Sequence, residues 1–363
     1  MRKALVASFA ASIAVSGAFA TAAVAAGPPA PTSPTGLKVH LVATGLSTPT
    51  SFAWGHRAMF AADGTQSQTN LNDFSGGVYQ LKHGKARKLK DSVVWASGLA
   101  FHKHVLYVSA VTKTKSGALK SQILAWRHWN GKNFTKRHAI YTAPAGYQGF
   151  NGLAFGPDGR IYVGSDVGLF NGNDHGPATT SPYLYDILAM NTRGKNLKVF
   201  AKGIRQPWQM VFPSGSSSPI VTDFGSNGVT SNPNPPDLLL KVKSGDNFGF
   251  PTCDWTQTTK GHGKNKKTTV SKKCNPYTSP LTWLAPHTDP GGIGIIGQTM
   301  YFSEFGFAGA AAGLPPAVAS LPVSGKGTPK RLVTGAVPII GLKTHSGSVY
   351  FGDLAGRVYR VKP

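Results

Sequence analysis

A short pattern of apolar and polar positions recurs along the chain. Its clearest copy, at 151–166, reads N-G-L-A-F-G-P-D-G-R-I-Y-V-G-S-D: an apolar segment, a Gly/Asp turn, and a second apolar segment that ends in a small or acidic residue. Similar segments occur at 50–63, 97–110, 208–223, 292–304 and 339–353. Short apolar runs on both sides of a turn are typical of β-strands, so each copy predicts an antiparallel hairpin.

The spacing of the copies predicts the fold class. They end at residues 63, 110, 166, 223, 304 and 353. Repeated units of this size, built from short strands and Gly-rich turns, are typical of β-propellers, and no long window has helical periodicity. We therefore predict an all-β protein with a six-bladed β-propeller over residues 37–363. The last strand, at 356–361, is expected to pair with 37–42 and close the ring.

Residues 1–26 have the pattern of a secretory signal peptide. Arg2 and Lys3 precede a run of small and apolar residues, and V-A-A at 24–26 forms a cleavage site. A membrane anchor is the weaker interpretation because the run is short, and no later window predicts a membrane span. The Pro-rich segment 27–36 is expected to be an extended linker. We expect a protein that is secreted, or that lies on the periplasmic or outer side of the cell envelope.

The chain is strongly basic. It has 38 Lys and Arg against 14 Asp and Glu, with a formal net charge of +24 at pH 7. Several lysines lie between Cys253 and Cys274, its 2 cysteines. We expect these cysteines to form a disulfide that closes the basic loop 253–274. The loop is either a solvated surface excursion or a contact for a polyanionic component of the cell envelope, and no motif indicates nucleic-acid binding.

The repeat also predicts where a site lies. The free ends of an antiparallel hairpin lie on the same side, so residues before the first strand and after the second strand of each copy share one face. These residues are Gln148, Arg205 and His287 before first strands, and Asp63, Asp166, Asp223, Glu304 and Asp353 after second strands. Two interpretations stay open. The side chains form a polar pocket at the channel mouth, in which Arg205 binds an anion, or the carboxylates cap backbone N–H groups and His287 is a structural imidazole.

Several motifs occur in an order that resembles a known family. They are G-L-A-F-G-P-D-G-R-I-Y-V-G-S-D (152–166), G-I-R-Q-P-W-Q-M (203–210), D-F-G-S (223–226), S-G-D-N-F-G-F-P (244–251) and P-H-T-D-P-G-G (286–292). Together they resemble the soluble quinoprotein glucose/sorbosone dehydrogenase family, over about residues 37–363. The resemblance implies a six-bladed propeller that binds pyrroloquinoline quinone (PQQ) and calcium over its channel. It also implies oxidation of a sugar hydroxyl by hydride transfer to the quinone.

The resemblance assigns cofactor-binding roles by position. Arg205 matches the arginine that polarises the cofactor, and Asp223 belongs to the adjoining cofactor-binding segment. Gly225 and Ser226 match the two residues whose carbonyls bind the cofactor calcium. Asp237 falls near the carboxylates of a second, structural calcium site, where this chain has one acid in place of a pair.

The sequence departs from the family at its catalytic base. Gln148 stands where the family has a histidine, and a glutamine side chain cannot accept a proton near neutral pH. His287 or His175 is the candidate replacement.

Three functions are consistent with these residues. The first is a secreted PQQ-dependent sugar or aldose dehydrogenase. The alternative is a catalytically inactive secreted propeller that binds a glycan, a polyanion or a protein, as the loss of the base and the scarcity of acids suggest. A lactonase of the gluconolactonase type is less favoured, because that chemistry needs a metal held by Glu and Asp or Asn. Glu304 is the one glutamate of the chain.

Overall fold

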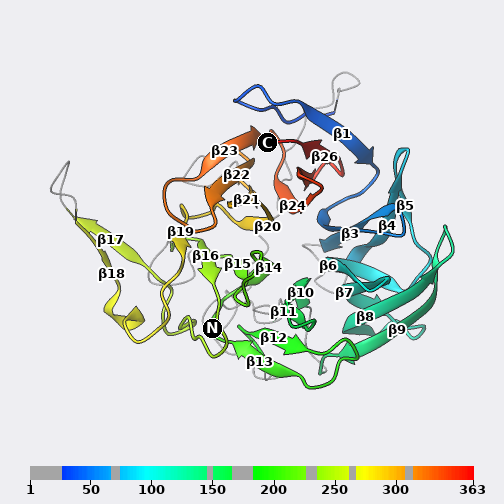
Figure 1. Cartoon of the computed structure of the whole chain (residues 1–363), viewed down its shortest axis with the longest axis horizontal. Coiled ribbons are helices and arrows are strands. Elements are labelled where there is room, and N and C mark those ends of the chain that lie inside the picture. Colours follow the sequence, from blue (N-terminus) through cyan, green and yellow to red (C-terminus); the bar gives the residue numbers. More distant parts are fainter. Residues whose placement is uncertain are drawn as a thin grey trace, which may run out of the picture.

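The computed structural model describes residues 27–66, 74–144, 150–165, 183–225, 235–260, 267–306 and 314–363. Within these ranges the regular structure is almost entirely β, and one helical turn, Lys272–Cys274, is present. The sheets are arranged radially around a common centre, as in a β-propeller (Figure 1). No helix in the described ranges is long and apolar enough to cross a bilayer.

Four antiparallel sheets have four strands each. They are β6 (Val93–His102), β7 (Val105–Lys113), β8 (Leu119–Trp129) and β9 (Phe134–Thr142); β10 (Phe150–Phe155), β11 (Ile161–Ser165), β12 (Ile187–Met190) and β13 (Lys198–Ala201); β14 (Pro207–Val211), β15 (Ile220–Asp223), β16 (Leu238–Lys241) and β19 (Thr282–Trp283); and β20 (Pro290–Ile296), β21 (Thr299–Glu304), β22 (Ala317–Pro322) and β23 (Lys330–Thr334).

An eight-stranded sheet joins the two ends of the chain. Its order is β2 (Pro49–Gly55), β3 (Ala58–Gln66), β4 (Phe74–Lys82), β5 (Gly84–Lys88), β1 (Val39–Thr44), β26 (Val358–Val361), β25 (Ser348–Asp353) and β24 (Ile339–His345). The antiparallel pairing of β1 with β26 sets Val39 opposite Val361 and confirms the predicted ring closure. The parallel pairing of β1 with β5 then joins the two halves.

The predicted hairpins are present. β2 pairs with β3, β6 with β7, β10 with β11, β14 with β15, β20 with β21, and β24 with β25, all antiparallel. The first strands of these hairpins contact one another in a closed cycle, from β2 through β6, β10, β14, β20 and β24 back to β2. They are therefore the innermost strands and surround the central axis (Figure 1).

Side-chain hydroxyls tie neighbouring sheets together near this axis. Each donates to a backbone carbonyl of the next first strand: Thr50 to Ala96 (2.7 Å), Ser97 to Phe150 (2.6 Å), Thr222 to Gly291 (2.8 Å) and Ser303 to Ile340 (2.7 Å). Because these groups are buried, each bond also removes the cost of an unpaired polar atom. Apolar side chains fill the space between the sheets further out.

The Pro-rich segment 27–36 lies against the sheets. Thr32 exchanges two backbone hydrogen bonds with Thr334, of 2.9 and 2.8 Å. Arg357 donates to the carbonyl oxygens of Pro28 (2.6 Å) and Pro29 (3.2 Å). The propeller therefore holds this segment by backbone contacts.

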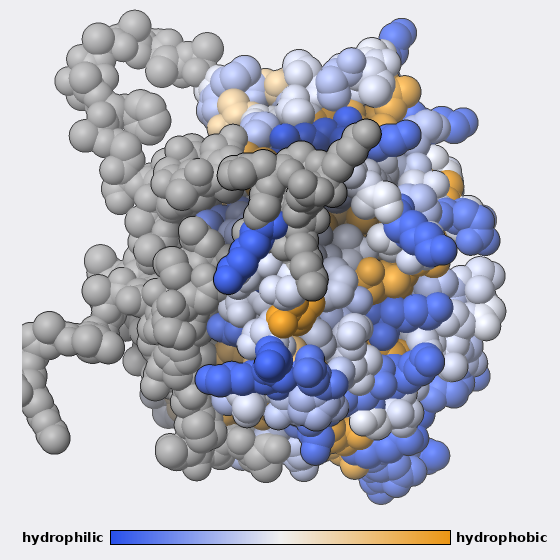
Figure 2. All heavy atoms as spheres, turned by 90° about the vertical axis from the view of Figure 1, so that its left-hand side faces the viewer, coloured by the Kyte–Doolittle hydropathy of each residue, from blue (hydrophilic) through white to orange (hydrophobic). Residues whose placement is uncertain are grey.

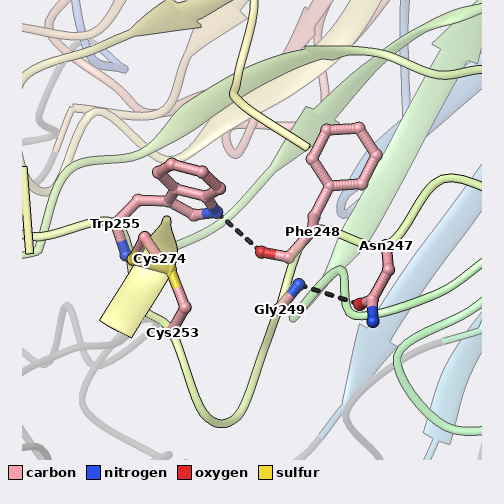
Figure 3. The surroundings of a disulfide bond; sticks show 6 residues. All are labelled: Asn247, Phe248, Gly249, Cys253, Trp255 and Cys274. Atoms are coloured by element: carbon pink, nitrogen blue, oxygen red, sulfur yellow. Dashed lines mark hydrogen bonds between the residues drawn. A yellow bond between two sulfur atoms is a disulfide. The ribbon is translucent and has the colours of Figure 1, made fainter. Parts of the chain in front are cut away.

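The cysteines form the expected disulfide, and the loop that they close carries a two-stranded ribbon. Both cysteines are buried, and their Cα atoms lie 5.1 Å apart. Trp255 packs beside them and donates from its indole N–H to the Phe248 carbonyl at 2.7 Å (Figure 3). From this anchor β17 (Gln257–Lys260) and β18 (Lys267–Val270) extend outward as a ribbon, at the left of Figure 1.

Hydrophilic side chains dominate the visible surface. Figure 2 shows them over most of the described part of one side of the molecule, and apolar side chains form only small, separate groups there. This distribution agrees with the excess of basic residues in the sequence and provides no extended apolar face on that side.

Candidate functional site

The free ends of the hairpins form one face, which we call the mouth face. The strand registers set Pro49 opposite Asp63, Pro207 opposite Asp223, Pro290 opposite Glu304 and Ile339 opposite Asp353 at these ends. Near this end every first strand has a β-bulge. A bulge interrupts the ladder and redirects side chains, which is how such irregularities contribute to binding sites.

The carboxylates that follow second strands hold backbone and basic groups in place. Asp63 accepts hydrogen bonds from the backbone N–H groups of Ser47 (2.9 Å) and Thr48 (2.5 Å). Asp223 accepts one from Gln206 (2.7 Å). These contacts support the capping interpretation for both aspartates.

The remaining carboxylates of this kind pair with arginines. Asp353 forms an ion pair with Arg357 at 2.7 Å, and Glu304 forms one with Arg331 at 2.9 Å. Both acids are buried and therefore need such a partner. Asp166 lies outside the described residues.

Arg205 lies just before β14 and is 3% exposed. One of its terminal nitrogens donates to the carbonyl oxygens of Phe224 (3.1 Å) and Gly225 (2.8 Å). The backbone N–H of Gly225 in turn donates to Asp237 at 2.6 Å. Arg205 therefore fixes the segment that follows β15, and the Gly225 carbonyl already faces a positive charge.

A buried group of charges surrounds this arginine. The second oxygen of Asp237 accepts a hydrogen bond from the backbone N–H of Asp289 at 2.9 Å. Burial, reinforced by the nearby Asp289 carboxylate, raises the pKa of Asp237 well above its usual range. Burial also raises the pKa of Asp289, whereas the charges of His287 and Arg205 lower it. The structure thus brings together Arg205, Asp237, His287 and Asp289, of which Asp289 was not among the predicted residues.

An aromatic cluster adjoins the arginine at the mouth. The rings of Trp208, on β14, and Phe224 lie 5.5 Å apart with an interplanar angle of 24°. Phe305 and Ile340 pack against them from neighbouring hairpins. Phe224 also provides the carbonyl that Arg205 binds, so the cation and the ring pair are connected directly.

Several buried polar atoms on the inner strands β10 and β14 have no partner among the described residues. They are the indole N–H of Trp208, both side-chain amide atoms of Asn151, and the side-chain oxygen of Gln209. Trp208 is 7% exposed, and Asn151 and Gln209 are fully buried. An unpaired buried polar atom is costly, so such atoms are commonly found where a ligand or water binds.

Asp186 is a further acid that the sequence analysis missed. It stands directly before β12, the position that Asp237 takes before β16 in the next sheet. Burial raises the pKa of Asp186 to about 7, although the charge of Lys202 opposes this shift. No hydrogen bond reaches its side chain from the described part of the chain. An acid immediately before an apolar strand is the sequence signal that could have identified it.

Three predicted site residues, Gln148, His175 and Ser226, lie outside the described residues. Arg205, Asp223, Gly225, Asp237 and His287 are all described and lie on the mouth face or in the charge cluster beside it. Within the described ranges, no group of three or more His, Cys, Asp or Glu side chains could hold a metal ion.

No protein-family model matches the sequence, and no curated protein sequence matches it. Solved structures do share its fold. A Trichoderma reesei carbohydrate-active enzyme of family AA12 matches with a TM-score of 0.66 and 15% identity, over 94% of this chain and 100% of the other. The soluble aldose sugar dehydrogenase of Escherichia coli, in its apo form, matches with a TM-score of 0.62 and 14% identity, over 90% of this chain and 99% of the other. A glucose dehydrogenase matches with a TM-score of 0.60 and 14% identity, over 90% and 99%. The chain therefore has the propeller fold of the soluble sugar dehydrogenases.

Proposed function

We propose that this chain is a six-bladed propeller that oxidises a sugar hydroxyl with a quinone bound at its mouth face. Each half of the eight-stranded sheet, β2–β3–β4–β5 and β1–β26–β25–β24, forms one blade. With the four four-stranded sheets, this makes six blades. The observation that carries the function is the position of buried Arg205, which donates to the backbone carbonyl of Phe224, the residue whose ring stacks with that of Trp208. The shared fold with an aldose sugar dehydrogenase supports it.

The mouth fits a planar, carboxylate-bearing quinone such as PQQ. The ring pair offers an aromatic surface, Arg205 supplies a positive charge beside it, and the indole N–H of Trp208 lacks a partner in the described residues. These are the contacts that a flat anionic ring needs. Trp208, Phe224 and Arg205 would hold the quinone, which supplies a two-electron acceptor for an alcohol.

The same residues do not fit the expected calcium ion at Gly225. The Gly225 carbonyl accepts a hydrogen bond from a guanidinium at 2.8 Å, and a cation on this oxygen would repel that group. Both carboxylate oxygens of Asp237 already accept backbone hydrogen bonds, from Gly225 and from Asp289, so this side chain is not free to turn towards an ion. We therefore propose that the quinone binds without a calcium ion at Gly225 or at Asp237.

His287 is the residue best suited to accept the hydroxyl proton. It is half-buried, and Asp289 lies close enough for its charge to interact with the imidazole. Histidine is the side chain that most often acts as a general base near neutral pH. The charge cluster would thus orient the base while the ring pair orients the ligand.

A second function is favoured because acidic side chains at the site already bind other groups of the protein. Asp223 and Asp237 bind backbone groups, and Glu304 binds Arg331. Such a site can bind a sugar without reacting with it. A secreted, non-catalytic glycan-binding propeller is therefore the second candidate. Secretion itself rests on residues 1–26, which lie outside the described residues.

Quinone titration of the purified mature protein tests both functions. We expect PQQ to bind without added calcium and Trp208→Leu to weaken this binding about tenfold. The protein with bound PQQ should reduce a dye when an aldose is added as substrate. His287→Gln should preserve quinone binding and abolish turnover, whereas His138→Gln, on exposed β9, should change neither. Binding of aldose without dye reduction would favour the second function. Absence of PQQ binding at high micromolar concentration would overturn the first.

A further inference from the structure

The face opposite the mouth has a basic groove. It lies at the turn ends of two hairpins, between Gly55 and Ala58 on one side and at His345 on the other, and has a volume of about 700 Å³. β1 and β26, which close the ring, form its outer wall. The hairpins separate it from the mouth by their full length, so it is a different site from the one described above.

Basic side chains line the groove in register. His40 on β1 lies opposite Arg360 on β26, and Arg360 lies opposite Tyr350 on β25. Directly opposite residues point to the same face of a sheet, and so do residues two apart along a strand. Lys38 and Lys362 therefore share this face with His40 and Arg360, and they line the adjoining end of the same groove.

The groove contains no acid to balance these charges. Its lining residues are all in the described ranges, and neither part of it includes an Asp or Glu. Arg57 adds another exposed cation at the β2–β3 turn. Cations that gather in one groove without a balancing acid repel one another, so this arrangement is best explained by an anionic ligand.

A cluster of three aromatic rings lies among the basic side chains. The rings of Trp54 and His345 are stacked, with centroids 4.5 Å apart and an interplanar angle of 4°. Tyr350 meets the Trp54 ring edge-on at 4.9 Å. The aromatic side chains thus form one compact subsite. Grooves for single-stranded nucleic acid instead offer successive ring platforms along their length.

We propose that this groove binds an acidic polysaccharide, with a sugar ring against the Trp54–His345–Tyr350 subsite and its carboxylates on Arg57 and Arg360. Arginine binds carboxylates through two parallel hydrogen bonds. The C–H groups on one face of a sugar ring pack well on an aromatic side chain because the face of the aromatic ring carries partial negative charge. A uronic acid unit combines a sugar ring and a carboxylate in one monosaccharide, which matches a single aromatic subsite with arginines on both sides.

Calorimetric titration with polygalacturonate at low salt tests the proposal, with neutral dextran and oligo-dT as comparison ligands. We expect binding of polygalacturonate and none of dextran. R57Q/R360Q should weaken binding about tenfold. The matched control R193Q/K136Q removes the same charge from exposed positions outside the groove and should change affinity less than about twofold. Circular dichroism and thermal unfolding confirm that each variant is folded.

Trp54→Leu separates stacking from charge. It should weaken polygalacturonate binding but leave the affinity for polyphosphate, which has no ring, unchanged. Equal losses in the two double variants would show that only the overall charge matters and would overturn the proposal. Tighter binding of oligo-dT than of polygalacturonate, lost in R57Q/R360Q, would assign the groove to nucleic acid and would also overturn it.

Discussion

Gln209 on β14 donates a hydrogen bond of 2.6 Å from its side-chain amide to the carbonyl oxygen of Ser97 on β6. The two strands are not neighbours in the inner ring, because β10 lies between them. The Gln209 side chain passes over Gly152 on β10, where a Cβ atom would lie 2.7 Å from the amide nitrogen. The bond thus connects two blades across a third, and the glycine provides the space for it.

Gly152→Ala should destabilise the protein. The added methyl group collides with a fully buried side chain, so we expect a loss of about 1–3 kcal/mol in the free energy of unfolding. Urea denaturation measures it. In a Gln209→Ala background the same substitution should cost much less, because the clash is gone. Additive effects of the two substitutions would contradict this account.

The disulfide should stabilise the base of the ribbon. Cys253→Ser/Cys274→Ser frees a loop whose ends are 21 residues apart and places two hydroxyls in an apolar cluster that includes Trp255. We expect a loss of about 3 kcal/mol from the chain-entropy effect alone. Thermal unfolding with and without reductant checks this: reductant should lower the melting temperature of the parent protein and leave that of the variant unchanged.

Hydrophobic patterning was sufficient to predict the hairpins and the closure of the ring. The copies ending at 223, 304 and 353 end with the last residues of β15, β21 and β25, and the copy ending at 63 ends where β3 pairs with the first residue of β2. A period-two pattern depends only on local geometry, and Gly and Asp mark its turns. For that reason the face that would carry the site could also be predicted.

The partners of the site residues could not be predicted in this way. The expectation that Arg205 binds an anionic ligand stays a prediction, and nothing in the sequence indicated that one of its terminal nitrogens also donates to two backbone carbonyls. Asp289 and Asp186 each stand directly before a strand, but their significance comes from burial, which depends on how the sheets pack. The basic groove combines residues 40, 57 and 360, which only the ring closure brings together.

Stability should decrease as the pH rises from about 4 to about 7. Burial raises the pKa of Asp91 to about 6 and that of Asp186 to about 7. The folded protein therefore binds these protons more tightly than the unfolded chain, and this stabilisation is lost as the pH passes through the folded-state values. Asp186→Asn should raise stability at pH 8, by about 2–4 kcal/mol, and have little effect at pH 4. Asp254→Asn, which alters a half-buried aspartate elsewhere, is the control. A gain for Asp186→Asn that is equal at both pH values would contradict the prediction.

Lys343→Met should stabilise the protein at neutral pH. Lys343 lies on β24 opposite Tyr350, and burial lowers the pKa of its ammonium group to about 8. A lowered lysine pKa means that folding disfavours the charged form, so the cost is complete below pH 8 and disappears as the pH rises towards the usual value of 10.5. Methionine has a similar length and no charge, so we expect a gain on the order of 1–2 kcal/mol at pH 7 and a much smaller gain at pH 10. Thermal unfolding of both proteins at the two pH values measures the difference, with Lys136→Met on exposed β9 as the control. A gain of the same size at pH 7 and pH 10 would show that packing, rather than charge burial, is responsible.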